Sequence, residues 1–185
     1  MELNAREQEI LIPLEEPPVL TVLDPDRIQL GVILDDLNLE DYQLVYQHSN
    51  TLPLRMKAIE RMVNAGDERS QEILVGALED PHWTIRRSAI SGIDWNTDPL
   101  KEKLIAIATS DLHSLVRADA IYAISDLEDK RFISALGEGI NQTDAYPVVA
   151  ASIRGLHVLD PDMAIQQIKA IESDSNSDIV SAIST

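Results

Sequence analysis

Residues 110–129 read S-D-L-H-S-L-V-R-A-D-A-I-Y-A-I-S-D-L-E-D, and the rest of the chain either repeats this stretch or leads into it. Apolar side chains recur in it at intervals of three and four residues: Val116, Ala120, Ile121, Ile124 and Leu127. This spacing is typical of an α-helix with one apolar face, and Asp111 stands ahead of it as a candidate N-cap. A neighbouring element has to cover that face.

The same apolar pattern returns at a nearly constant spacing. We call the repeat position that Val116 occupies the anchor. Ile85 and Leu54 occupy the same position in earlier copies, at steps of 31 residues (116 − 85 and 85 − 54). The anchor is held by Val148 after 32 residues (148 − 116) and by Ile179 after a further 31 (179 − 148). A period of this size, with one helix per copy and space for another, indicates a stacked helical solenoid.

We name the anchored helices B helices and expect an A helix before each. One apolar position of the A helices recurs every 31 residues, at Leu74, Ile105 and Leu136 (105 − 74 and 136 − 105). We predict five A and B pairs, at 37–48 and 53–65, 68–79 and 82–94, 98–109 and 112–127, 129–141 and 144–158, and 161–173 and 177–185. The predicted fold class is an all-α, right-handed solenoid similar to HEAT and armadillo repeats.

Capping residues stand where this frame needs them. Asn38 is a candidate N-cap with an aspartate three residues later. Asp80, Asp98 and Asp160 each offer a capping carboxylate followed by proline, which is suited to the first helical position. Gly66 marks a break between two helices.

The N-terminal part has a different pattern. Residues 6–14 and 19–23 favour two short strands, with the turn residues E-E-P-P between them. Because two strands alone are marginal in water, this β-hairpin-like segment is either the end of an upstream sheet or a hairpin on the first helices. We therefore divide the chain into a strand lead-in and connector (1–34) and a helical repeat domain (35–185). We also expect it to be part of a longer protein, since it starts in apparent sheet and its last helix lacks a cap.

The composition limits the classes of partner. Acidic residues number 32 and basic residues 15, so the formal net charge is −17. This charge repels phosphate backbones and anionic lipid, so we expect neither nucleic acid nor membrane as a partner; it can also serve solubility alone. The sequence has no apolar run of the ~18 residues that a membrane span needs.

The run I-P-L-E-E-P-P-V-L-T-V-L-D-P-D (12–26) resembles the segment of aminopeptidase N-like zinc metallopeptidases, the gluzincin aminopeptidases, in which a β-sandwich ends and a helical domain begins. Residues 41–59 are similar to the first HEAT-like pair of that domain. Three copies carry its R-x-x-A pattern, at Arg55 and Ala58, Arg86 and Ala89, and Arg117 and Ala120. In the fourth copy Val149 and Ser152 stand there, and the pattern stops.

The resemblance implies the non-catalytic C-terminal region of a zinc aminopeptidase. It would pack on the upstream catalytic and β-sandwich domains of the same parent chain and shape peptide access, with peptide substrate as a further contact. None of the four histidines, His48, His82, His113 and His157, begins the H-E-x-x-H motif of such a zinc site. We therefore expect no catalytic residue, metal ligand or cofactor in this chain, and zinc in the parent's catalytic domain.

Two columns of side chains are candidate sites. His82 and His113 share a repeat position three residues before their anchors, so they lie near one another on one edge, as metal ligands or as capping residues. A second column holds Arg55, Arg86 and Arg117, with Asp80 and Asp111 five residues before anchors. Its arginines either hold a peptide carboxylate on the concave face or form a structural ladder with aspartates and helix ends of neighbouring repeats.

Two functions follow from these patterns. The first is the aminopeptidase region described above. The alternative is a free-standing HEAT-repeat scaffold that binds a protein partner on its concave face, because solenoids commonly do so and the fold alone does not select a partner.

Overall fold

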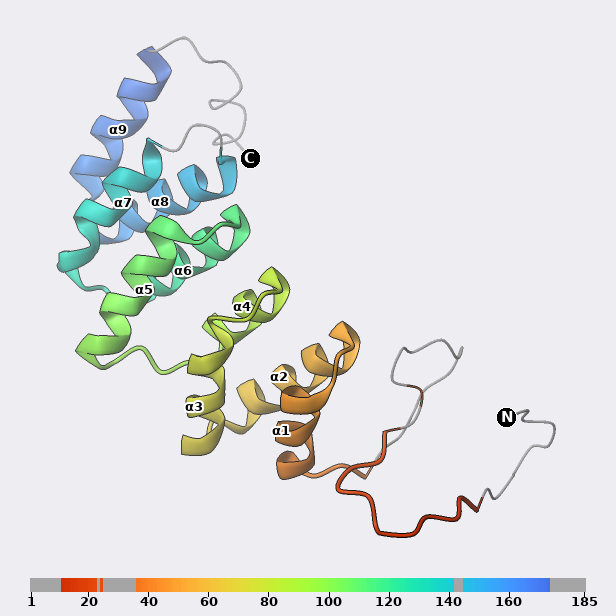
Figure 1. The fold of residues 1–185 in the computed structure, drawn as a ribbon. Coiled ribbons are helices and arrows are strands. Elements are labelled where there is room, and N and C mark those ends of the chain that lie inside the picture. The colour runs from red at the N-terminus through yellow and green to blue at the C-terminus, as the bar shows by residue number, and fades with distance from the viewer. Residues whose placement is uncertain (1–10, 23, 25–35, 142–144, 174–185) are drawn as a thin grey trace.

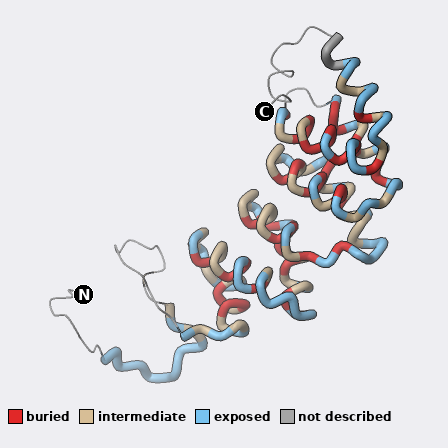
Figure 2. The backbone as a smooth tube through the Cα atoms, turned by 180° about the vertical axis from the view of Figure 1, so that it is seen from behind, coloured by how far each residue is buried: buried red, intermediate tan, exposed pale blue. Residues whose placement is uncertain are grey.

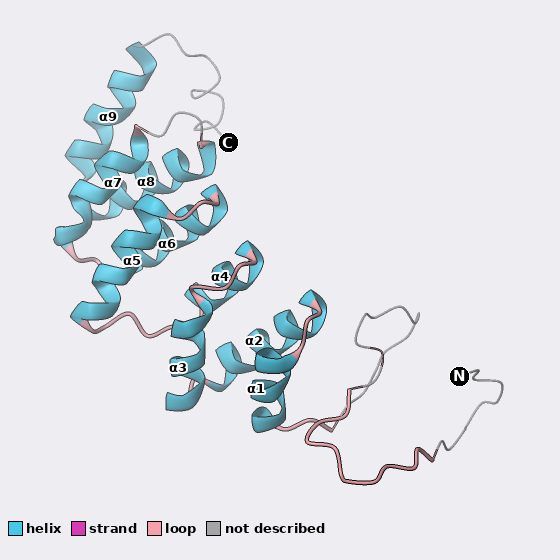
Figure 3. Ribbon diagram, viewed as in Figure 1, coloured by secondary structure: helices cyan, strands magenta, loops and turns pink. Residues whose placement is uncertain are grey.

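The computed structural model describes residues 11–22, 24, 36–141 and 145–173. These residues form helices joined by loops and contain no strand (Figure 3). The helices are α1 (Leu39–His48), α2 (Leu52–Ala65), α3 (Glu68–Ala77), α4 (Trp83–Ile90), α5 (Asp98–Ser110), α6 (Ser114–Asp126), the 3₁₀ turn η1 (Lys130–Phe132), α7 (Ile133–Ile140), α8 (Tyr146–Leu159) and α9 (Pro161–Ser173). The predicted helices between residues 37 and 173 are confirmed. The predicted helix 177–185 lies outside the described residues.

The helices stack as a two-layer solenoid (Figure 1). Each A helix packs on the B helix of its own pair, as α1 does on α2 and α5 on α6. The B helices α2, α4, α6 and α8 contact one another in succession, and α9 packs on α8. The predicted all-α solenoid is therefore confirmed. None of the described helices combines the length and the apolar character that crossing a membrane requires.

One apolar core runs along the stack (Figure 2). The anchors Leu54, Ile85, Val116 and Val148 are all buried in it. Burying an aliphatic side chain in this way stabilises a fold by about 1.5–3 kcal/mol. The periodicity of the sequence therefore identified the side chains that hold neighbouring pairs together.

Several predicted helix ends are confirmed, whereas the cap predicted at Asp98 is wrong because Thr97 is the N-cap of α5. Asn38 forms a reciprocal capping box with Asp41 at the start of α1. Gly66 ends α2 in the left-handed conformation, with φ of 64°, which glycine adopts without a steric penalty. Asp160 caps α9, because its Oδ1 accepts the Met163 N–H at 3.0 Å.

The N-caps predicted at Asp80 and Asp111 are wrong. The N-caps of α4 and α6 are His82 and His113, two residues further on. Each aspartate Oδ1 instead accepts the backbone N–H of the histidine at 2.8 Å. This local turn precedes the helix and leaves the second carboxylate oxygen for a partner outside the turn.

The predicted strands are not observed. Residues 11–22 have no strand, and most of their side chains are exposed, while residues 6–10 and 23 lie outside the described part. Pro13, Pro17 and Pro18 cannot donate to a β-ladder, so this stretch is a poor partner for strand pairing. Only Leu20 and Val22 pack against the helical core in this stretch.

Candidate functional site

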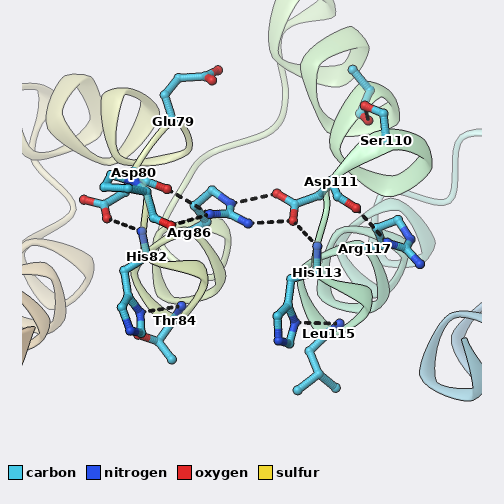
Figure 4. Close-up of polar contacts among 12 residues, drawn as sticks. Glu79, Asp80, His82, Thr84, Arg86, Ser110, Asp111, His113, Leu115 and Arg117 are labelled. Atoms are coloured by element: carbon cyan, nitrogen blue, oxygen red, sulfur yellow. Dashed lines mark hydrogen bonds and ion pairs between the residues drawn. The ribbon is translucent and has the colours of Figure 1, made fainter.

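Three arginines occupy the fourth position of successive B helices, as Arg55 in α2, Arg86 in α4 and Arg117 in α6. Figure 4 shows Arg86 directed toward Asp111 of the next helix pair, with Arg117 on the other side of Asp111. The structure thus brings the predicted column together in one row. We call this row the ladder, and its members are Arg55, Asp80, Arg86, Asp111 and Arg117.

Asp80 is the first junction of the ladder, and only 5% of its surface is exposed to solvent. Its Oδ2 forms an ion pair with Arg55 and accepts the Tyr46 hydroxyl at 3.0 Å. Its Oδ1 accepts the His82 N–H. Both oxygens therefore have donors, which offsets the cost of burying the charge. Burial raises the pKa of Tyr46 above its ordinary value, although the nearby Arg55 acts in the opposite direction.

Asp111 is the second junction, and it links the starts of the consecutive B helices α4 and α6. Arg86 binds it with two hydrogen bonds, from Nε to Oδ2 at 2.7 Å and from Nη2 to Oδ1 at 2.8 Å. The Nη1 of Arg86 also donates to the Asp80 carbonyl at 2.9 Å, so one side chain joins the second and third helix pairs. Arg117 donates to the Asp111 carbonyl at 2.7 Å. A two-pronged guanidinium contact of this kind fixes orientation as well as distance.

The two predicted histidines lie at helix starts. The Nδ1 atoms of His82 and His113 accept the backbone N–H groups of Thr84 and Leu115, each at 3.3 Å. The Trp83 ring stacks on His113, with ring centres 4.0 Å apart. The described residues contain no group of three or more His, Cys, Asp or Glu side chains placed to hold a metal ion. The observed roles of these imidazoles are therefore capping and stacking.

The B layer carries two adjacent grooves, whose lining residues we call the B surface. The first lies between α2 and α4, has a volume of about 550 Å³ and is lined in part by Met56 and Val63. The second lies between α4 and α6, has a volume of about 510 Å³ and is lined in part by Tyr122 and Asp126. Ser91 lines both grooves. Both volumes are in the range of about 300–1,000 Å³ that is usual for binding sites.

The second groove exists because α4 ends early. We predicted this helix to continue to residue 94, but it ends at Ile90 and a loop follows over residues 91–97. A Cβ on Gly92 would lie 2.6 Å from the Val63 side chain, so this position has space only for glycine. Gln71 of α3 holds the loop with both amide atoms, donating to the Gly92 carbonyl at 2.6 Å and accepting the Asp94 N–H at 2.8 Å.

Comparison with known families gives a match to HEAT repeats over residues 44–125, from within α1 almost to the end of α6. This part of the chain is a HEAT-like helical repeat region. No curated protein matches the chain. The HEAT match supports the repeat prediction and gives no support to the predicted aminopeptidase parent.

The residues that shape the groove in this HEAT-like region were not predicted from the sequence. Loop residues 91–97 separate α4 from α5, whereas only residues 66–67 separate α2 from α3. The signal available in the sequence was Gly92 inside the predicted helix, together with Trp95. In the structure Trp95 is 6% exposed and donates its indole N–H to the Ile90 carbonyl. The pairing of Arg87 with Asp119, at 2.5 Å between Nε and Oδ2, was also not predicted.

Proposed function

We propose that this chain is a HEAT-like scaffold that binds a protein partner on the B surface. The observation that carries the proposal is the pair of grooves that meet at Ser91, because together they form a hollowed surface across three successive B helices. Stacked repeats build extended binding surfaces of this kind from the exposed faces of their helices.

The ladder supports this role from within the scaffold. The Arg86 guanidinium is already bound by Asp111 and by the Asp80 carbonyl, so it is not a free donor for a peptide carboxylate. Its contacts join helix pairs and fix their relative orientation. We therefore assign the ladder to the geometry of the B surface and the grooves to partner contact.

Site-specific photocrosslinking in the native host tests this assignment. A photoreactive residue at Glu60 or Asp126, both exposed on the B surface, should trap the same partner. The matched controls are Glu72 on α3 and Glu102 on α5, which are exposed on A helices. Trapping of that partner at all four positions, or only at the control positions, would overturn the proposal.

The aminopeptidase region remains the second candidate. Its support is the resemblance of residues 12–26, and the described residues 11–22 lack the strands on which that resemblance depends. It predicts an H-E-x-x-H motif and a downstream glutamate encoded upstream of residue 1. It also predicts that the purified chain, even with zinc added, hydrolyses no aminoacyl chromogenic substrate. A start codon at Met1 would exclude this candidate.

A further inference from the structure

The groove between α4 and α6 combines an apolar floor with an acidic rim. Its buried apolar lining residues are Ile90, Ile93 and Trp95, and less buried apolar surface comes from Tyr122, Ala123 and Leu127. Long basic side chains pack their aliphatic stems on such surfaces and keep the charged end at a polar edge. The shape therefore suits an arginine or lysine side chain with its stem on the floor.

The charges of the lining favour a cationic occupant. The groove is lined by Asp94, Asp119 and Asp126 against the single cation Arg87, a net charge of −2 (1 − 3). Arg87 is held by Asp119. Within the described part of the chain, Asp94 and Asp126 have no ion-pair partner. Two exposed carboxylates thus remain available at the rim.

The position of the groove along α4 and α6 adds to its negative potential. The groove lies at the C-terminal ends of α4 and α6, where the helix dipole is negative. The ladder arginines Arg86 and Arg117 lie in the first turns, at the opposite ends of these two helices. Arg154 approaches the Tyr122 ring, with its guanidinium carbon 5.8 Å from the ring centre, but it is not part of the groove lining.

The neighbouring groove does not share this charge. The groove between α2 and α4 is lined by Lys57 and Glu60, whose charges cancel. The whole chain carries −17, which attracts a basic segment and repels a second copy of this chain. Of the two grooves on the B surface, charge complementarity therefore favours the α4–α6 groove, and it favours a basic occupant.

We propose that the α4–α6 groove binds an arginine or lysine side chain from a basic, extended segment of the partner protein, with its charge between Asp94 and Asp126. This inference rests on the proposed function and names the chemistry of the partner. It assigns the apolar floor to the aliphatic stem and the two rim carboxylates to the guanidinium or ammonium group.

Fluorescence anisotropy with a labelled penta-arginine peptide tests the inference on the full chain. The double variant Asp94→Asn/Asp126→Asn should weaken binding about tenfold, because it removes two ion pairs. Its matched control is Glu72→Gln/Glu102→Gln, which changes the net charge equally on the A helices and should change binding by less than about twofold. Asparagine at residue 94 keeps an oxygen that can accept the Asn96 N–H, so the groove variant should fold like the wild type.

A second pair of variants tests the groove by adding a positive charge, without removing any carboxylate group. Ser91→Arg adds a cation at the groove and should also weaken binding, whereas Ser134→Arg on α7 should not. Penta-glutamate and penta-glutamine peptides should not bind. Equal loss in groove and control variants, no loss in either, or no binding of penta-arginine would overturn the inference.

The crosslinking result separates this inference from the proposed function. If positions 60 and 126 trap a common partner but penta-arginine does not bind, the proposed basic character of the partner segment is wrong. The assignment of the B surface to partner binding is then retained. If neither position traps a partner, the proposed function itself fails.

Discussion

At the scale of single residues, Asp111 shows how burial and hydrogen bonding oppose each other. Burial alone would raise the pKa of this carboxyl group, but hydrogen bonds from the Arg86 guanidinium and the His113 N–H hold it below its ordinary value of 3.8. The same bond with Asp111 raises the pKa of Arg86. The ionised carboxylate is therefore the form that the folded chain favours.

This lowered pKa predicts a pH dependence of stability. Because the folded pKa lies below the unfolded one, the ionised form stabilises the fold fully at pH values well above about 4. That contribution falls as the pH drops below the unfolded pKa and through the folded pKa. Urea unfolding of the wild type and of Asp111→Asn should therefore show a free-energy difference that is constant from pH 7 to 5 and shrinks below about pH 4. A difference that grows on acidification would contradict this assignment.

At the scale of elements, α7 contains two glycines in different surroundings. A Cβ on Gly139 would collide with the Ser152 Oγ of α8, whereas a Cβ on Gly137 would meet nothing within 4 Å. Gly139 thus permits the close approach of the two helices. Gly137 has no such role and only lowers the helix propensity of α7.

Alanine at each position tests this contrast within one helix. Gly137→Ala should raise the free energy of unfolding by about 0.5–1 kcal/mol, because alanine restricts the unfolded chain and favours the helix. Gly139→Ala should lower it by about 1–3 kcal/mol, because the added methyl group overpacks the contact with Ser152. Both values come from chemical denaturation, and equal effects of the two substitutions would contradict the packing described here.

Periodicity was sufficient to predict the B helices, because each anchor such as Ile85 or Val116 is buried by its neighbours in the same way. It could not predict where α4 ends. That end depends on Gly92 fitting against Val63, a contact between residues of different helix pairs. Local patterns do not contain such contacts, so the groove that the loop creates was missed.

The ladder was predictable in its members and only partly in its geometry. The shared repeat position of Arg86 and Arg117 indicated a column, and the structure places both beside Asp111. Pairing of the arginines with aspartates was one of the two alternatives predicted for this column, and it is the one observed. The expectation that the same aspartates cap their helices was wrong, although an aspartate before a helix usually does so. Here His82 and His113 are the caps, so the carboxylate groups of Asp80 and Asp111 can bind arginines.

At the scale of the whole molecule, separate helix pairs act as one scaffold only if neighbours are coupled. The apolar core supplies most of this coupling, and the stability of a solenoid depends on such interfaces between repeats. Arg86 adds a directional contact, since it binds the Asp80 carbonyl of its own pair and the Asp111 carboxylate of the next. The side chains of Arg86 and Asp111 are 13% and 9% exposed, so water screens this contact little.

A double-mutant cycle on Arg86→Ala and Asp111→Ala, measured by chemical unfolding, tests this coupling most directly. The control cycle is Lys103→Ala with Glu79→Ala, an ion pair that also joins the second and third helix pairs but is far more exposed. We predict a favourable coupling energy of about 2 kcal/mol for Arg86 and Asp111, and less than about 0.5 kcal/mol for the control pair. Additive effects of Arg86→Ala and Asp111→Ala would contradict the ladder as a link between helix pairs.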